Sequence, residues 1–120
     1  MIQPTDLRIG NYVFDWVKRI AIVDSIHKDG SIRLSSEGNY KHESFKSDRL
    51  SPIPLTEEIL LKCGARRIDK YTFVLLGLFI HMRKMGFVFN VGKKKIAIEH
   101  LHQLQNWAHA LTNTELNIAL

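Results

Sequence analysis

The first 50 residues alternate apolar and polar positions over short stretches, as β-strands do. Ile20 and Ile22 lie two residues apart, so they predict one face of a half-buried strand. Asp29-Gly30 follows this run and precedes a second apolar run, Ile32–Leu34. Such a dipeptide predicts a hairpin because both turn positions tolerate positive φ. The pattern therefore predicts an antiparallel β-structure for this part of the chain.

Two further signals extend the predicted strands. Glu37-Gly38-Asn39 predicts a turn, and a shorter strand is expected after it over residues 40–45. A Gly-x-x-Val sequence, Gly10–Val13, precedes the first strand. This spacing resembles SH3-like or KOW-type small barrels, a fold that hosts unrelated functions. The resemblance implies an SH3-like small β-barrel or curled sheet over residues 1–52.

A short helix is predicted after the strand region. Pro52 and Pro54 disfavour helical geometry in the residue before each of them, so they predict an extended connector. Thr56 predicts the N-cap of the helix, and the two glutamates that follow it suit the first turn. Gly64 predicts the end of the helix. The helix has only about two turns, so it needs tertiary packing to be stable.

From Tyr71 onward the apolar period is again two residues. This period predicts an antiparallel meander of four strands, Tyr71–Leu76, Leu78–Arg83, Phe87–Val91 and Lys95–Ile98. In the second strand Phe79, His81 and Arg83 share a face. The polar end of that face predicts that it is partly exposed.

A closing helix is predicted over Glu99–Leu111 by an apolar stripe at helical spacing, formed by Leu101, Leu104, Ala108 and Leu111. The stripe would cover the sheet. Thr112-x-x-Glu115 fits a capping box and predicts a further helical turn. Together the elements predict an α+β protein, in which a strand module over residues 1–52 shares a core with the helix, sheet and closing helix of residues 53–120.

The charge of the chain is unevenly distributed. The length of 120 residues allows one compact domain or two very small modules, and the net charge is +5. Nine bases lie from Lys62 to Lys95, opposed only by Asp69. If these side chains fall on one surface, that surface attracts polyanions. We therefore expect phosphate contacts from the bases in the sheet, Arg83, Lys84, Lys93, Lys94 and Lys95. The alternative is that lysines at turns only keep the sheet soluble and guard its edges.

Aromatic residues interleave with these bases and allow two interpretations. Aromatic side chains of binding proteins stack on unpaired nucleobases. Phe87 and Phe89, however, share the sheet face that the closing helix would cover. Large apolar side chains lie mostly in protein interiors, so the core interpretation is favoured for these two.

No catalytic, metal or cofactor site is predicted. Cys63 is the only thiol in the sequence. A reactive role would need a lowered pKa, which the neighbouring Arg66 and Arg67 favour. A free cysteine on an apolar helix is usually a core residue, so that interpretation is preferred. His102 and His109 lie on a polar stripe of the closing helix. One helix supplies too few ligands for a metal, so this stripe is expected to be a solvated face or to form hydrogen bonds to a neighbouring loop.

Two stretches carry a family resemblance. Ile53–Gly64 contains Pro-Leu-Thr-Glu-Glu, and His102–Leu116 contains His-Gln-Leu-Gln-Asn and Ala-Leu-Thr. They resemble a family of small uncharacterised proteins of prophages and mobile elements in gut bacteria. Relatives usually carry a glycine where this chain has Asn113, a residue that also tolerates a left-handed turn. The family implies a genomic setting and no established activity, which leaves open the role of His102, Gln103, Gln105 and Asn106.

These observations favour a binding protein over an enzyme. The start of the chain has no basic cluster followed by an apolar stretch, so we expect no secretory signal. The longest apolar run is eight residues, so we expect no membrane span. A cytoplasmic location is therefore expected. We expect a non-enzymatic protein of a phage or mobile element that contacts nucleic acid non-specifically through its basic surface. The alternative is a protein-interaction or assembly module that acts by sheet-edge pairing or dimerisation.

Overall fold

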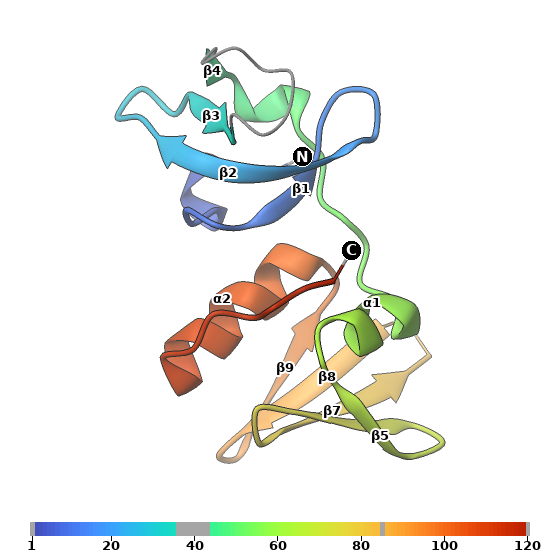
Figure 1. Ribbon diagram of the computed structural model, residues 1–120. Coiled ribbons are helices and arrows are strands. Elements are labelled where there is room, and N and C mark those ends of the chain that lie inside the picture. The colour runs from blue at the N-terminus through green and yellow to red at the C-terminus, as the bar shows by residue number, and fades with distance from the viewer. Residues whose placement is uncertain (1, 36–43, 85, 120) are drawn as a thin grey trace. The chain divides into compact units, whose positions relative to one another are not determined.

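The structure, a computed structural model, describes residues 2–35, 44–84 and 86–119. The chain divides into two compact units, Met1–Ile53 and Pro54–Leu120, each with its own antiparallel sheet (Figure 1). The predicted α+β class is confirmed. Each unit is described by itself below.

The first unit is a four-stranded sheet with the order β1-β2-β3-β4. Its elements are two 3-10 helices, Pro4–Asp6 and Ser47–Arg49, and the strands β1 (Tyr12–Phe14), β2 (Ile20–Ile26), β3 (Ile32–Leu34) and β4 (Ser44–Phe45). Within the described residues β1 and β4 do not pair with each other, and a single bridge between Phe14 and Ser51 continues the sheet beyond β1. The predicted barrel is therefore not closed, and the unit is an open sheet.

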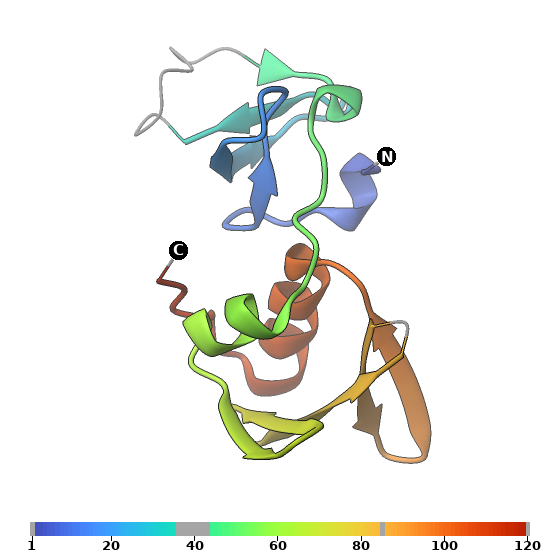
Figure 2. The ribbon, with the colours of Figure 1, turned by 90° about the vertical axis from the view of Figure 1, so that its right-hand side faces the viewer.

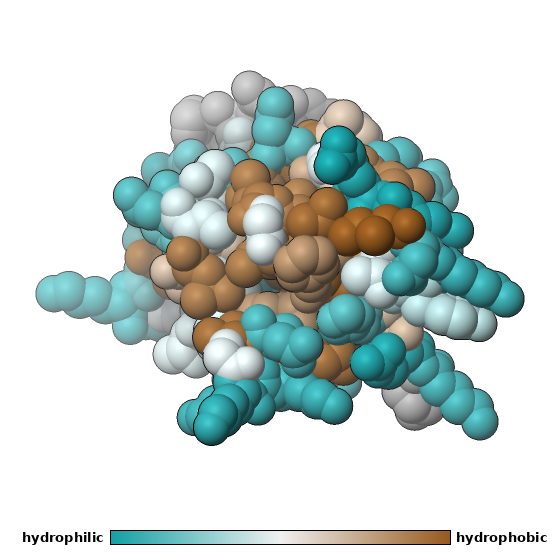
Figure 3. Space-filling view, turned by 90° about the horizontal axis from the view of Figure 1, so that it is seen from below, coloured by the Kyte–Doolittle hydropathy of each residue, from teal (hydrophilic) through white to brown (hydrophobic). Residues whose placement is uncertain are grey.

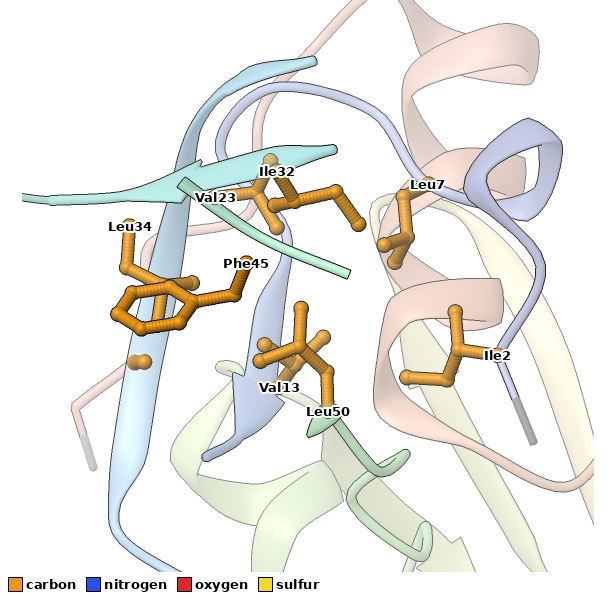
Figure 4. Close-up of a cluster of buried hydrophobic side chains, with 9 residues drawn as sticks. Ile2, Leu7, Val13, Val23, Ile32, Leu34, Phe45 and Leu50 are labelled. Atoms are coloured by element: carbon orange, nitrogen blue, oxygen red, sulfur yellow. The ribbon is translucent and has the colours of Figure 1, made fainter. Parts of the chain in front are cut away.

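One side of this sheet carries the core of the first unit (Figure 4). The buried side chains are Ile2, Leu7, Val13, Ala21, Val23, Ile32, Leu34, Phe45 and Leu50. The face predicted for β2 is wrong, because Ala21 and Val23 point inward whereas Ile20 is 48% exposed. The pairing of β1 with β2 determines which face of β2 is buried, because Ala21 lies opposite the fully buried Val13 of β1. The apolar alternation of the sequence had suggested that Ile20 and Ile22 form the buried face.

The predicted hairpin turn between β2 and β3 is confirmed. Gly30 has φ of +88°, a conformation that L side chains rarely adopt. Asp29 Oδ1 accepts the Ser31 N–H at 2.9 Å and the Ser31 hydroxyl at 2.7 Å, which closes the turn. The predicted turn at Glu37–Asn39 and the start of the strand predicted over residues 40–45 lie outside the described residues.

The second unit is a five-stranded meander with two helices. It contains α1 (Glu57–Lys62), β5 (Arg66–Asp69), β6 (Thr72–Leu75), β7 (Leu78–Arg83), β8 (Gly86–Val91), β9 (Lys94–Ile98) and α2 (Leu101–Thr112), and the strand order follows the chain. The four predicted strands are confirmed to within a residue or two. The additional strand β5 was missed because its four residues are all exposed and show no apolar alternation.

Both helices of this unit cover the same face of the sheet (Figure 2). Alternate strand residues point toward them and are buried, among them Phe73, Ile80, Phe89 and Ile98. The predicted stripe of α2 is buried except for Leu111, which is 39% exposed, and His102 and Gln105 are buried beside it. Phe87 and Phe89 both lie in this core, so the core interpretation of these aromatics is confirmed.

The helix ends follow local capping rules. Thr56 Oγ1 accepts the Ile59 N–H at 3.2 Å, as predicted for the N-cap of α1. Helix α2 begins at Leu101 and not at Glu99, because the Glu99 carbonyl accepts the Leu55 N–H at 3.0 Å and keeps this segment extended. Gln103 Oε1 accepts the backbone N–H groups of Glu99 and His100 at 2.9 and 3.0 Å. This side chain therefore caps the start of α2.

The predicted helical turn after α2 is wrong. Asn113 ends the helix with φ of 53°, the left-handed conformation in which glycine or asparagine often ends a helix. Thr112 belongs to the last turn of α2, where its hydroxyl donates to the Ala108 carbonyl at 2.6 Å. Thr112 is therefore not available as a new N-cap. The following residues have no regular structure up to Ala119, whose N–H donates to the Lys62 carbonyl at 3.0 Å.

Candidate functional site

The five predicted phosphate-binding residues lie in two groups at opposite ends of the β5–β9 sheet. Arg83 and Lys84 lie at the β7–β8 turn, whereas Lys93, Lys94 and Lys95 lie at the β8–β9 turn. Strand β8 separates the two turns by about 17 Å at 3.3–3.4 Å per residue. Lys94 and Lys95 are adjacent on β9, so they point to opposite faces of the sheet. The five residues therefore do not form one cluster.

Two of the other bases form ion pairs within the second unit. Lys62 Nζ lies 3.2 Å from Glu58 Oε1 on α1. Arg67 forms an ion pair with Glu57, and its guanidinium lies 5.2 Å from the centre of the Phe73 ring. These two side chains thus have structural partners in the unit.

The face of the β5–β9 sheet opposite the helices, which we call the outer face, is apolar at its centre. Phe79 of β7 is 55% exposed there and lies beside Val74 of β6. The adjacent row runs Thr72, His81, Val88 and Ala97 across four strands. Figure 3 views this side and shows apolar atoms gathered in the centre, with long hydrophilic side chains around them. An exposed apolar patch bordered by polar side chains is a candidate interaction site.

Cations border the outer face on several sides. Arg66 of β5 lies opposite Val74, and Lys95 of β9 lies opposite Asn90. These two cations therefore share the outer face with Phe79. Arg83 lies on the same face, four residues after Phe79 on β7. The adjoining turns add three lysines, Lys70, Lys84 and Lys93, and the acids at this border are Asp69 and Glu99. Six bases thus oppose two acids around the patch. The five strands make the outer face about 19 Å wide, and Phe79 and Arg83 lie about 13 Å apart along β7.

Asp69 is one of the two acids and is engaged in its own turn. Its Oδ1 accepts the Tyr71 N–H at 2.9 Å. This hydrogen bond, together with one from the Thr72 side chain, lowers the pKa of the Asp69 carboxyl. The group is therefore ionised at neutral pH, and part of its hydrogen-bonding capacity is used by the β5–β6 turn.

The β6–β7 turn carries an unusual residue beside the outer face. Leu76 and Gly77 have φ of 50° and 77°, so this two-residue hairpin turn is of the type with two positive φ values. Asn-Gly is the usual choice there, because a left-handed conformation costs most other residues about 1–2 kcal/mol. Leu76 is nevertheless 44% exposed. Neither packing nor turn chemistry explains an apolar residue at this position.

The His-Gln-Leu-Gln-Asn segment is structural for the most part. His102 is 4% exposed and Gln105 is 1% exposed, and the His102 ring stacks on His100 with ring centres 5.7 Å apart. Gln103 caps α2, as described above, and Asn106 is half-buried. The expectation of a solvated face is wrong for His102, because α2 packs this side chain inside the unit, whereas the alternative of hydrogen bonds to a neighbouring loop stays a prediction. In the described part of the chain, metal-ligating side chains do not gather in groups of three or more.

Cys63 lies inside the second unit. It is 4% exposed, and burial raises the pKa of its thiol to about 11. Arg66 and Arg67 do not offset this effect. The interpretation as a core residue is confirmed.

The sequence contained part of the signal for the outer face. The alternation Phe79, His81 and Arg83 predicted a shared, partly exposed face, and the structure confirms it. The neighbours Val74 and Val88 were not predicted to join this face, because their placement depends on the register between strands.

The helices that the structure describes are too short or too polar to cross a membrane. Comparison of the chain with protein-family models, with curated proteins and with solved structures found no match.

Proposed function

We propose that this protein binds single-stranded nucleic acid on the outer face of the β5–β9 sheet. The observation that carries the proposal is an exposed aromatic ring, Phe79, on the central strand of a sheet face bordered by six bases and two acids. Phage or mobile-element origin stays a prediction from the family resemblance.

The centre of the outer face suits unpaired bases. Every nucleobase has a π-face, so stacking on an aromatic ring is tolerant of sequence and contributes about 1–3 kcal/mol per base. Phe79 offers such a ring, and the half-buried His81 and Val88 lie on the same face of the adjacent row. In a duplex the base faces are already stacked on each other, and an open sheet face does not enter a groove. The surface therefore favours a single strand.

The border of the outer face suits the phosphates of that strand. Arg66 of β5 and Lys95 of β9 lie in the same row as Phe79, one on each side of it, and Arg83 lies at the other end of β7. A strand that crosses the apolar centre meets a cation at both ends of its path. The two separated groups of bases, which argue against one compact basic patch, fit this arrangement. Sheet platforms of this size bind two or three bases.

Self-association through the sheet is less well supported. Two copies of the outer face would bring like-charged borders together, which is unfavourable. The edge strands also carry features that prevent pairing: β5 is fully exposed and contains a register shift between Arg67 and Asp69, and β9 begins with two lysines. These features favour a polyanion over a second copy of the chain.

The test is fluorescence anisotropy with a labelled single-stranded oligonucleotide and its duplex. With about three phosphate contacts, affinity for the single strand should fall about 20-fold between about 50 and 200 mM salt. The single strand should bind more tightly than the duplex.

Charge-matched variants locate the surface. The double substitution Arg83→Gln and Lys95→Gln should remove most of this salt dependence. The double substitution Lys28→Gln and Lys46→Gln in the first unit removes the same charge from exposed positions and should leave the salt dependence nearly unchanged. Equal losses in both variants, tighter binding of the duplex, or no binding at low salt would contradict the proposal. Light scattering that shows a dimer would favour assembly instead.

A further inference from the structure

A small hollow opens on the outer face at the β7–β8 end of the sheet. It has a volume of about 150 Å³ and is lined by Arg83, Gly86, Phe87, Val88, Ala97, Ile98 and Glu99. Gly86 lies opposite Arg83 and has no side chain to fill the space between them. The side chains of Phe87 and Ile98 are buried on the inner side, so Val88 and Ala97 supply the apolar lining on the outer face.

The hollow carries opposite charges. Arg83 and Glu99 are both exposed and both line it, yet within the described part of the chain no ion pair joins them. The Arg83 Nη1 atom lies 3.5 Å from the Met82 carbonyl, which is a weak contact for a hydrogen bond. Guanidinium donors and carboxylate acceptors are therefore both available to a ligand in this hollow.

The backbone holds Glu99 firmly in place. Its N–H donates to Gln103 Oε1 at 2.9 Å, and its carbonyl accepts the Leu55 N–H at 3.0 Å. These bonds tie the residue to the cap of α2 and to the connector before α1. Fixing the backbone in advance lowers the cost of binding a ligand through the side chain.

We infer that this hollow binds one guanine base of the bound strand, an inference that rests on the proposed function. Its volume is below the 300–1,000 Å³ of typical small-molecule pockets, so it suits one planar group. Guanine carries two adjacent N–H donors on its Watson–Crick edge, and a carboxylate, which only accepts, takes both of them. Arginine is the usual partner of the guanine O6 and N7 acceptors. Adenine, cytosine and thymine do not offer two adjacent donor groups on this edge.

The test compares two oligonucleotides by fluorescence anisotropy: an oligothymidylate of nine nucleotides and the same oligomer with one guanine at its centre. The wild-type protein should bind the guanine-containing oligomer roughly 5- to 150-fold more tightly, the range of one well-formed base contact. Glu99→Gln removes the charge and one acceptor, so the ratio of the two affinities should fall to the part that Arg83 alone supplies through the guanine O6 and N7 acceptors. The ratio is the readout because removing an acid strengthens binding of both oligomers.

The matched control is Glu58→Gln, the same chemical change on α1, which covers the other face of the sheet. It should keep the guanine preference. Equal affinities in the wild type, a preference that Glu99→Gln leaves undiminished, or an equal loss of preference in Glu58→Gln would overturn the inference while the proposed function stands. If neither oligomer binds, the proposed function fails, and the inference fails with it.

A free guanine nucleotide has the same hydrogen-bonding edge, so competition by guanosine monophosphate distinguishes the two sources of the base. Weak competition, at concentrations far above those of the oligomer, supports a site that reads a base within a strand. Competition by guanosine monophosphate at the same concentration as the oligomer would overturn the assignment to a strand.

Discussion

Replacing Phe79 with alanine removes the ring at the centre of the outer face. Phe79 is 55% exposed and pairs with Val74 across β6 and β7, so its removal takes little apolar area out of the core. Burying a whole phenylalanine side chain stabilises a protein by about 1.5–3 kcal/mol, and only part of this ring is covered. We therefore expect the free energy of unfolding to fall by about 1 kcal/mol or less.

The same substitution should have a larger effect on binding. Stacking of one base on an aromatic ring is worth about 1–3 kcal/mol, which corresponds to a loss in affinity of roughly 5- to 150-fold. Anisotropy titration with an oligothymidylate measures the affinity, and urea denaturation of the same sample measures the stability. An affinity loss that exceeds the stability loss separates a binding role from a packing role.

Phe79→Leu is the matched control for this prediction. Leucine keeps an apolar side chain of similar size at this strand position but has no ring, so it should bind almost as weakly as alanine. A leucine variant that binds like the wild type would refute the stacking argument, because apolar contact alone would then be sufficient. An alanine variant within twofold of the wild type would remove Phe79 from the site.

Three further predictions concern stability and reactivity. Leu76→Asn should raise the free energy of unfolding of the second unit by about 1 kcal/mol in urea denaturation, because asparagine tolerates the positive φ of this turn. Cys63 has a pKa raised from 9.0 to about 11 in the folded protein, so the stability it contributes is present below pH 9 and is lost as the pH rises toward 11. Alkylation of this thiol at pH 8 should be roughly a hundredfold slower in the folded chain than in urea. Asp15→Ala should cost about 1–3 kcal/mol in the first unit, measured by Trp16 fluorescence, because the buried carboxylate accepts the Val17 and Arg19 N–H groups at 3.0 and 2.8 Å.

Each of these predictions has a result that contradicts it. An unchanged free energy of unfolding in Leu76→Asn would mean that the β6–β7 turn carries no strain. Equal alkylation rates in folded and unfolded chains would mean that Cys63 is accessible. For Asp15 the control is Asp24→Ala, an exposed acid on β2, where a change below about 0.5 kcal/mol is expected. Similar losses in both variants would assign the effect to net charge.

Local rules predicted the elements that depend on neighbouring residues. The Asp29-Gly30 turn and the Thr56 cap each depend on a few consecutive residues and were predicted correctly. Four strands of the meander were also predicted from the sequence, because an apolar period of two residues is a local property of the chain. Strand β5 was missed because an exposed edge strand needs no apolar alternation.

The sequence by itself determined the α+β composition, the meander with its two helices, the core role of Phe87 and Phe89, and the concentration of positive charge from Lys62 to Lys95. Only the tertiary structure decided that these cations separate to the two ends of a sheet, that Phe79 lies beside Val74, and that Arg83 and Glu99 border one hollow. The physical reason is that strand register is a non-local property. A shift of one residue would turn every side chain of a strand to the other face, and the energy that prevents this shift comes from packing between strands that are distant in the sequence.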